Sequence, residues 1–125
     1  MLKESRIISF VSTQAPETAK RFYIDQLGLE LVADEPSALV LNANGTMLRV
    51  SKVASFEPAP FTVLGWKVAD IKAKVDDLVE RDVVFERFDA FKQDERGIAT
   101  FSDGTMVAWF KDPDGNILSL TQFQD

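Results

Sequence analysis

A short polar turn between two apolar runs decides the fold, in the stretch Val107-Ala108-Trp109-Phe110-Lys111-Asp112-Pro113-Asp114-Gly115-Asn116-Ile117-Leu118-Ser119-Leu120-Thr121-Gln122. Proline presets φ for a turn, glycine has no Cβ to clash, and Asp and Asn tolerate a left-handed backbone. The stretch therefore predicts a β-hairpin, with strands around Trp109 and Leu118 and a turn at Asp114-Gly115.

The residues before this hairpin predict a strand, a helix, a further strand and a loop. A β-rich run over 62–68 precedes Asp70, which is a good N-cap residue. The apolar face of the helix that follows consists of Ile71, Val75, Leu78 and Val79. A strand over 83–88 and a polar loop over 92–96 then lead to the hairpin.

The first half of the chain repeats the same order of elements. We expect a strand over 6–11, then a helix that begins at Pro16 and ends at Gly28 as its C-cap. Strands over 29–33, 38–41 and 47–53 follow, and Asn44-Gly45 is a hairpin turn between the last two. The prolines in 54–60 indicate a linker between the halves.

This repeat predicts an α+β fold built from two βαβββ modules, one at about 5–53 and one at about 61–123. Each module forms a curved mixed sheet, and the two sheets surround a cleft with the helices on the outer faces. We expect one domain over 1–125, a length that suits a single core.

Composition narrows the function. The 125 residues are 46% hydrophobic and carry a formal net charge of -6, which disfavours nucleic acid as a partner. No apolar run approaches the ~20 residues of a membrane span, and the first residues lack a signal peptide's apolar region. The absence of cysteine excludes disulfides and thiolate sites. We expect a cytoplasmic protein with no membrane partner.

Three motifs resemble those of one known family. The string Phe22-Tyr23-Ile24-Asp25-Gln26-Leu27-Gly28-Leu29 resembles an FY-x-x-x-LG element, and Val68-Ala69-Asp70-Ile71 resembles a V-x-D-I element. Together with the final hairpin, they resemble the vicinal oxygen chelate superfamily of glyoxalases, bleomycin resistance proteins and extradiol dioxygenases. The chain departs at Asp82, where the family often has glycine, but Asp also tolerates a left-handed cap.

The resemblance also implies where a metal would bind. Members that hold a metal have one ligand on each half's first strand and one on its last strand, which corresponds here to Ile8, Arg49, Val63 and Ser119. Isoleucine and valine cannot ligate, arginine is permanently positive, and serine is a weak ligand. The chain has no histidine either. We therefore expect no metal and no cofactor.

Strand alternation extends these positions to a set of candidate ligand-binding residues. The set consists of Phe10, Arg49, Val63, Lys67, Trp109 and Ser119. Arg49 either holds a carboxylate or phosphate or pairs with a carboxylate of the protein, and Trp109 either stacks on a ligand or belongs to the core. The segment 93–97 is either a lid that pivots at Gly97 or a solvated loop. Side chains that should face the helices are Leu48, Val50, Leu64, Trp66, Leu118 and Leu120.

Three functions fit these residues. The first is a metal-independent small-molecule-binding protein that sequesters a drug or metabolite, and the resemblance implies a homodimer. The second is a metal-independent lyase or isomerase that acts on a small carbonyl or carboxylate metabolite and uses Arg49 for orientation. The third is a sensor or subunit that uses the fold only for association. The inferred cleft face carries no Asp or Glu and the chain no histidine, so the sequence names no catalytic residue.

Overall fold

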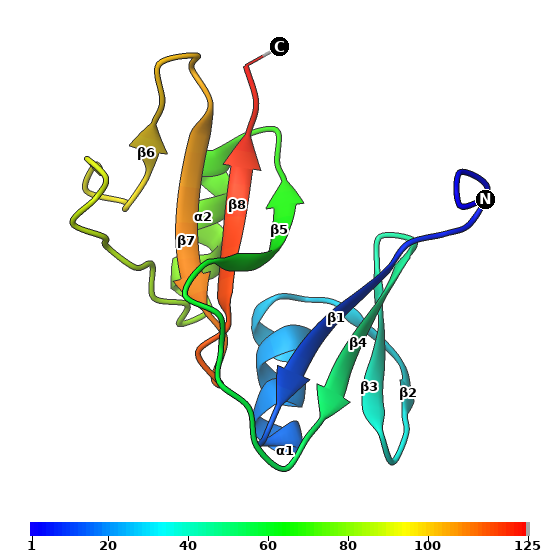
Figure 1. The fold of residues 1–125 in the computed structure, drawn as a ribbon. Coiled ribbons are helices and arrows are strands. Elements are labelled where there is room, and N and C mark those ends of the chain that lie inside the picture. The colour runs from blue at the N-terminus through cyan, green and yellow to red at the C-terminus, as the bar shows by residue number, and fades with distance from the viewer. Residues whose placement is uncertain (125) are drawn as a thin grey trace. The chain divides into compact units, whose positions relative to one another are not determined.

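The computed structural model describes residues 1–124 and shows two compact units (Figure 1). Unit 1 is Met1–Glu57 and unit 2 begins at Pro58, so the boundary lies inside the predicted linker over 54–60. Each unit contains a four-stranded mixed sheet and a helix, which confirms the predicted α+β class.

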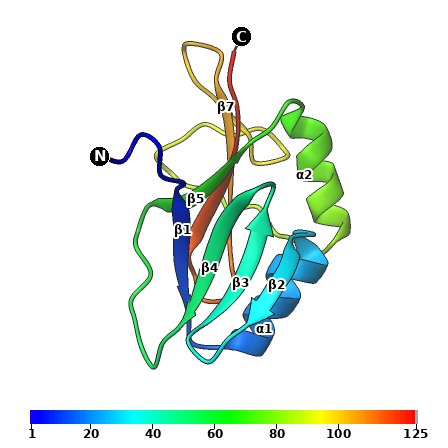
Figure 2. The ribbon, with the colours of Figure 1, turned by 90° about the vertical axis from the view of Figure 1, so that its right-hand side faces the viewer.

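Unit 1 contains the elements β1 (Ile8–Thr13), α1 (Pro16–Lys20), η1 (Arg21–Gln26), β2 (Glu30–Asp34), β3 (Ala38–Ala43) and β4 (Thr46–Lys52). Its strands are ordered β1-β4-β3-β2, with β1 and β4 parallel and the other pairs antiparallel. Figure 2 shows β4, β3 and β2 side by side, as this pairing requires.

Unit 2 contains the elements β5 (Thr62–Lys67), α2 (Ile71–Glu80), β6 (Ala99–Thr100), β7 (Met106–Lys111) and β8 (Ile117–Gln122). The order β5-β8-β7-β6 repeats that of unit 1, again with a parallel first pair. The repeat that the sequence indicates is therefore a repeat of topology.

The first helix differs from the single α-helix that the spacing predicts. It begins at Pro16 as expected, but from Arg21 it widens into the π-helix η1. The widened turn buries Phe22 and Tyr23, whose rings meet edge-on with centroids 5.1 Å apart. Gly28 ends the helix at φ 76°, which confirms it as the cap residue.

The predicted turns are confirmed by their backbone angles. Asn44 and Gly45 have φ of 50° and 93°, as a two-residue hairpin turn needs, and the Asn42 side chain accepts a hydrogen bond from the Gly45 N–H at 2.7 Å. Asp82 has φ 67°, so aspartate does adopt the left-handed cap. Asp70 caps α2 by accepting from the Ala73 N–H at 3.2 Å.

The strand expected over 83–88 is wrong. Only Phe85 bridges to Phe110, and the Glu86 N–H donates to the Trp109 carbonyl at 2.8 Å before the chain leaves the sheet. It leaves because Phe88 turns onto Trp109, where the rings meet edge-on at 5.6 Å. The short strand β6 then takes the sheet edge beside β7.

Each sheet buries one face against its helix. In unit 1, Leu48 and Val50 of β4 are fully buried, and the strand alternation predicted for them is confirmed. In unit 2, Leu118 and Leu120 of β8 are buried on the same face as Phe110, against which Trp66 stacks at 6.3 Å. Within residues 1–124, no helix has the length and apolar character to cross a membrane.

The turn that decides the fold rests on one buried carboxylate. Asp112 Oδ1 accepts from the backbone N–H groups of Asp114 and Asn116, and Oδ2 accepts from Asn116 Nδ2 at 2.8 Å. We expect Asp112→Ala to lower the free energy of unfolding by about 2–4 kcal/mol, because buried donors lose a charged acceptor. Urea unfolding measures this, and Asp89→Ala at an exposed site is the control; equal stability of the two variants would contradict the role of Asp112.

Candidate functional site

The face of each sheet that lies opposite its helix is called here the distal face. In unit 1 it carries Arg49 and Phe10, which are cross-strand partners on β4 and β1. Ile8 and Met47 form the neighbouring pair on the same face. The distal face of unit 1 thus places one guanidinium among three large apolar side chains.

Arg49 has a partner, and the partner is a protein carboxylate. Its Nη2 lies 3.4 Å from Glu35 Oε1, at the turn between β2 and β3. This separation is longer than the ~2.7–2.9 Å of a strong charge-assisted hydrogen bond. The side chains of Arg49 and Glu35 are 27% and 47% exposed, so water reaches both. The guanidinium is oriented by Glu35 but is still accessible.

The apolar neighbours of Arg49 are exposed. Phe10 is 59% exposed, and Ile8 and Met47 are also among the exposed large hydrophobic residues of the chain. Apolar surface beside a charged group is what an amphiphilic small molecule needs from a protein.

The distal face of unit 2 brings together Lys67, Trp109 and Ser119. Trp109 and Ser119 are cross-strand partners, and Gly65 of β5 pairs with Ser119 on the other side. Lys67 pairs with Thr121, two residues further along both strands. Val63 lies at an irregularity in the β5–β8 pairing and has no Cα partner there, which strand alternation does not predict.

Trp109 is packed by aromatic residues of its own unit. Phe91 stacks on its ring with centroids 4.7 Å apart and an interplanar angle of 22°, and Phe88 meets it edge-on. Trp109 is consequently only 8% exposed and shares a core cluster with Ala99 and Ile117. The sequence leaves two roles open for Trp109, stacking on a ligand or packing in the core, and in the structure its ring packs in the core of unit 2.

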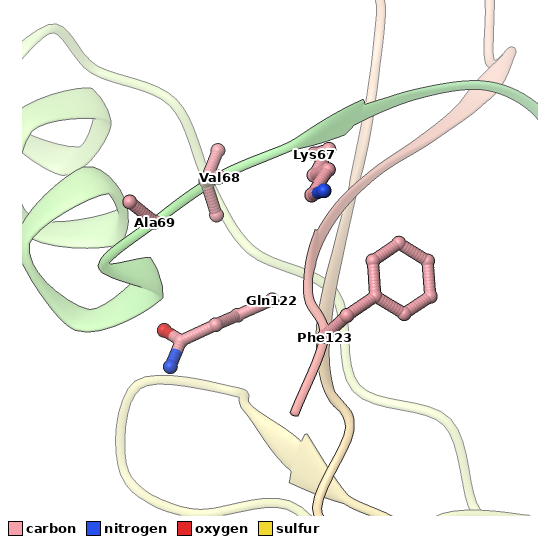
Figure 3. A pocket seen from close by; sticks show the side chains of 5 residues that line it. All are labelled: Lys67, Val68, Ala69, Gln122 and Phe123. Carbon is pink, nitrogen blue, oxygen red and sulfur yellow. The ribbon is translucent and has the colours of Figure 1, made fainter. Parts of the chain in front are cut away.

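A shallow pocket of about 490 Å³ lies where β5 and β8 end (Figure 3). Its lining residues are Lys67, Val68, Ala69, Gln122 and Phe123. Gln122 Oε1 accepts from the Ile71 N–H at 2.9 Å and so fixes the start of α2. Lys67 forms no ion pair with any residue of 1–124, so its ammonium is free to meet an anion.

The segment 93–97 is tied down by its own side chains. Gln93 Nε2 donates to the carbonyls of Glu86 and Gly97, while its Oε1 accepts from the Phe88 N–H. Asp94 Oδ1 accepts from the N–H groups of Arg96 and Ile98. Gly97 has φ 88°, which suits a turn inside this bonded segment. The bonds favour a fixed loop over a lid.

The donor set does not fit a metal ion. The four family positions hold two aliphatic side chains, the Arg49 guanidinium and the Ser119 hydroxyl. Across residues 1–124, no three His, Cys, Asp or Glu side chains gather into a group suited to a metal. The aliphatic side chains offer no ligand atom, the guanidinium repels a cation, and a neutral hydroxyl is a weak ligand for a divalent cation.

Sequence reasoning missed Glu35 and Gly65. Glu35 lies in a turn that the strand pattern does not place over any face. Gly65 did give a signal, because a glycine inside a strand often marks a close approach of other atoms. Here a Cβ at Gly65 would lie 2.8 Å from Ser119 Oγ.

A family model described as Glyoxalase/Bleomycin resistance protein/Dioxygenase superfamily matches residues 8–120. No curated protein matches.

Many solved structures share the fold, and three represent them. A glyoxalase/bleomycin resistance protein/dioxygenase from Alicyclobacillus acidocaldarius has a TM-score of 0.72 and 17% identity, over 98% of this chain and 93% of that chain. A lactoylglutathione lyase from Agrobacterium tumefaciens has a TM-score of 0.69 and 20% identity, over 96% and 95% of the two chains. A superfamily member from Sphaerobacter thermophilus DSM 20745 has a TM-score of 0.70 and 23% identity, over 93% and 96%. At these identities the likeness shows the fold alone.

The 93–97 segment is also held to α2, by an ion pair that acid should release. Arg96 Nε and Nη2 donate to the two oxygens of Asp76 at 2.9 and 3.1 Å, which lowers the pKa of Asp76 below its ordinary value of 3.8. A lowered pKa in the folded state stabilises the fold above 3.8, and this contribution is lost as the pH falls through the lowered value. We expect Asp76→Asn to flatten the fall in melting temperature between about pH 6 and about pH 2.5. Asp77→Asn on the same helix is the control, and identical pH profiles for wild type and Asp76→Asn would contradict the prediction.

Proposed function

Since the chain belongs to the glyoxalase/bleomycin resistance protein/dioxygenase superfamily, we propose that it is a metal-independent protein that binds a small organic carboxylate. The observation that carries the proposal is Arg49. By the resemblance, Arg49 stands where family members that hold a metal have one of its ligands. It presents a fixed positive charge on the distal face of unit 1.

A guanidinium suits a carboxylate because its donors match the two oxygens with parallel hydrogen bonds. Glu35 holds Arg49 from one side at 3.4 Å and leaves part of the fork accessible. A ligand carboxylate therefore either adds to this pair or displaces Glu35.

The remainder of the ligand is apolar in this proposal. Phe10, Ile8 and Met47 surround Arg49 on the same face and are exposed. Removing such surface from water contributes about 25 cal/mol per Å², which favours an aromatic or branched aliphatic acid over a very small one. A drug or metabolite that combines a carboxylate with an apolar body would match both the charge and the apolar surface of this face.

A lyase or isomerase that acts on a small carbonyl or carboxylate metabolite is the second candidate. Glu35 favours it, because a carboxylate beside a substrate-orienting arginine is placed to accept a proton. If the protein converts a small carbonyl or carboxylate metabolite, Glu35→Gln should abolish this conversion and leave binding of the metabolite intact. That result would favour an enzyme over a protein that only sequesters its ligand.

Binding is tested by thermal shift of the full chain with benzoate, pyruvate and phosphate, each with and without Zn²⁺ or Ni²⁺. We expect benzoate to stabilise the protein equally with and without metal. Arg49→Lys keeps the charge but loses the fork, so it should weaken binding, and Arg49→Ala should weaken it by about 1.5–3 kcal/mol.

Arg21→Ala, which removes an exposed arginine from unit 1, is the matched control. Unchanged benzoate binding in both Arg49 variants would overturn the arginine site. Stabilisation that appears only with metal would overturn metal independence.

We further propose a homodimer. The sheets end in edge strands β1 and β2 in unit 1 and β5 and β6 in unit 2, and edge strands tend to be paired or covered. Phe10 and Ile8 add exposed apolar surface on β1. Light scattering at micromolar concentration should give twice the 14.0 kDa chain mass, and a single-chain mass would contradict the proposal.

A further inference from the structure

We propose that Asn44, in the turn between β3 and β4, is a site of spontaneous deamidation, and that the Asn42 side chain slows this reaction by holding the Gly45 N–H. The inference goes beyond the proposed function, because it concerns a covalent change of the protein itself and not a bound ligand. It rests on the residues of one hairpin in unit 1, which Figure 2 shows as the neighbouring strands β3 and β4.

The reaction needs only water and the backbone that follows the asparagine. The Gly45 nitrogen loses its proton to the solvent and attacks Asn44 Cγ, the bond from Cγ to the side-chain nitrogen breaks, and ammonia leaves. The product is a five-membered succinimide. Water then opens one of its two carbonyls, which gives either aspartate or isoaspartate at this position. Glycine favours the attack because no Cβ crowds its nitrogen.

The turn leaves this site open to the solvent. Asn44 and Gly45 are both exposed, and their φ angles of 50° and 93° place them at the two central positions of a hairpin turn. A Cβ built on Gly45 would meet no atom within 4 Å outside its chain neighbours. Water therefore reaches the reacting atoms without any opening of the sheet.

The Asn42 side chain holds the nitrogen that would attack. Its Oδ1 accepts a hydrogen bond from the Gly45 N–H at 2.7 Å, which is at the short end of the range for such bonds. Solvent has to displace this acceptor before it can remove the proton from the nitrogen. The hydrogen bond thus stabilises the unreactive form of the Gly45 amide.

The same hydrogen bond opposes the rotation that ring closure requires. The Gly45 nitrogen must come into line with the Asn44 Cβ by rotation about the Asn44 Cα–C bond, whereas a hairpin turn of this kind directs that nitrogen away from the side chain. Asn42 fixes the nitrogen in the turn geometry. Deamidation in the folded protein therefore waits for the turn to open locally.

The other two asparagines of the chain lack this chemistry. Asn116 is 4% exposed, donates from Nδ2 to Asp112 Oδ2 at 2.8 Å, and precedes the branched residue Ile117. Asn42 precedes Ala43, whose Cβ crowds the attacking nitrogen. Asn44 is the asparagine that glycine follows, so the modification should begin there.

Isoaspartate at this position would disturb the register of β4. It places the former Cβ in the main chain, and the two-residue turn that closes the pair Ala43 and Thr46 has no room in its geometry for a longer backbone. Leu48 and Val50 depend on that register for their burial. We expect chains that carry isoaspartate to melt at a lower temperature than unmodified chains.

The test is incubation of the full chain at mildly alkaline pH, in buffer and in concentrated urea, followed by peptide mass spectrometry that separates aspartate from isoaspartate. We expect both products at position 44, formed about tenfold or more slowly in the folded protein than in urea. Equal rates in buffer and urea would overturn the protection by the turn. The absence of both products in urea would overturn the site.

Variants at position 42 then test the protecting hydrogen bond. Asn42→Ala should deamidate about threefold to tenfold faster than wild type in buffer, the factor that one net hydrogen bond provides, and at the wild-type rate in urea. Asn42→Asp keeps an acceptor oxygen and is the matched control, so it should stay slow in buffer. Asn42→Val favours the strand and repeats the test if Asn42→Ala does not fold. A folded variant without the acceptor that deamidates at the wild-type rate would overturn the role of Asn42.

Discussion

The two-residue period of the central strands β4 and β8 is the constraint on which the rest of the structure depends. Each of these strands pairs in parallel with one neighbour and antiparallel with the other, so its register is fixed from both sides. Leu48 and Val50 in one unit, and Leu118 and Leu120 in the other, must face the helix, and each contributes about 1.5–3 kcal/mol by burial. A slip by one residue would expose them all and bury Arg49.

The same constraint explains which parts of the fold were predictable. Turn residues such as Asn44 and Asp82 act through their own backbone angles, so local sequence is enough to place them. The strand expected over 83–88 failed because a contact distant in sequence decides it: Phe88 packs on Trp109 instead of extending the sheet edge. The π-helix η1 was missed for a related reason, since an ordinary amphipathic pattern does not reveal the widened turn.

In the candidate site, too, the positions on the strands were predictable and the contacts made by loops were not. Alternation places Arg49 and Ser119 opposite the helix once the buried leucines are known, because a strand has only two faces. It does not reveal that Glu35 reaches Arg49 from a turn, or that Phe91 covers Trp109, since both depend on how loops return to the sheet. The irregularity at Val63 likewise depends on the β5–β8 pairing and not on the residue itself.

The cross-strand partners of Arg49 in unit 1 and of Ser119 in unit 2 form one row of residues across each sheet, and the two rows differ in chemistry. In unit 1 the row is Phe10, Arg49 and Val40, so a large cation stands among apolar side chains and takes a carboxylate of the chain as its neighbour. In unit 2 the row is Gly65, Ser119 and Trp109, so the Ser119 hydroxyl lies close to the glycine, where a Cβ would be only 2.8 Å from its oxygen, and beside a packed ring. A divalent metal attracts the oxygens of a ligand by charge, whereas these rows offer N–H and O–H donors that act by direction as well as charge. Such donors need no histidine and no cysteine, which is consistent with a sequence that contains neither. In the proposed function, the positive charge of Arg49 on the distal face of unit 1 has a physical reason, because a fixed cation in an acidic chain makes a local region that attracts an anionic ligand.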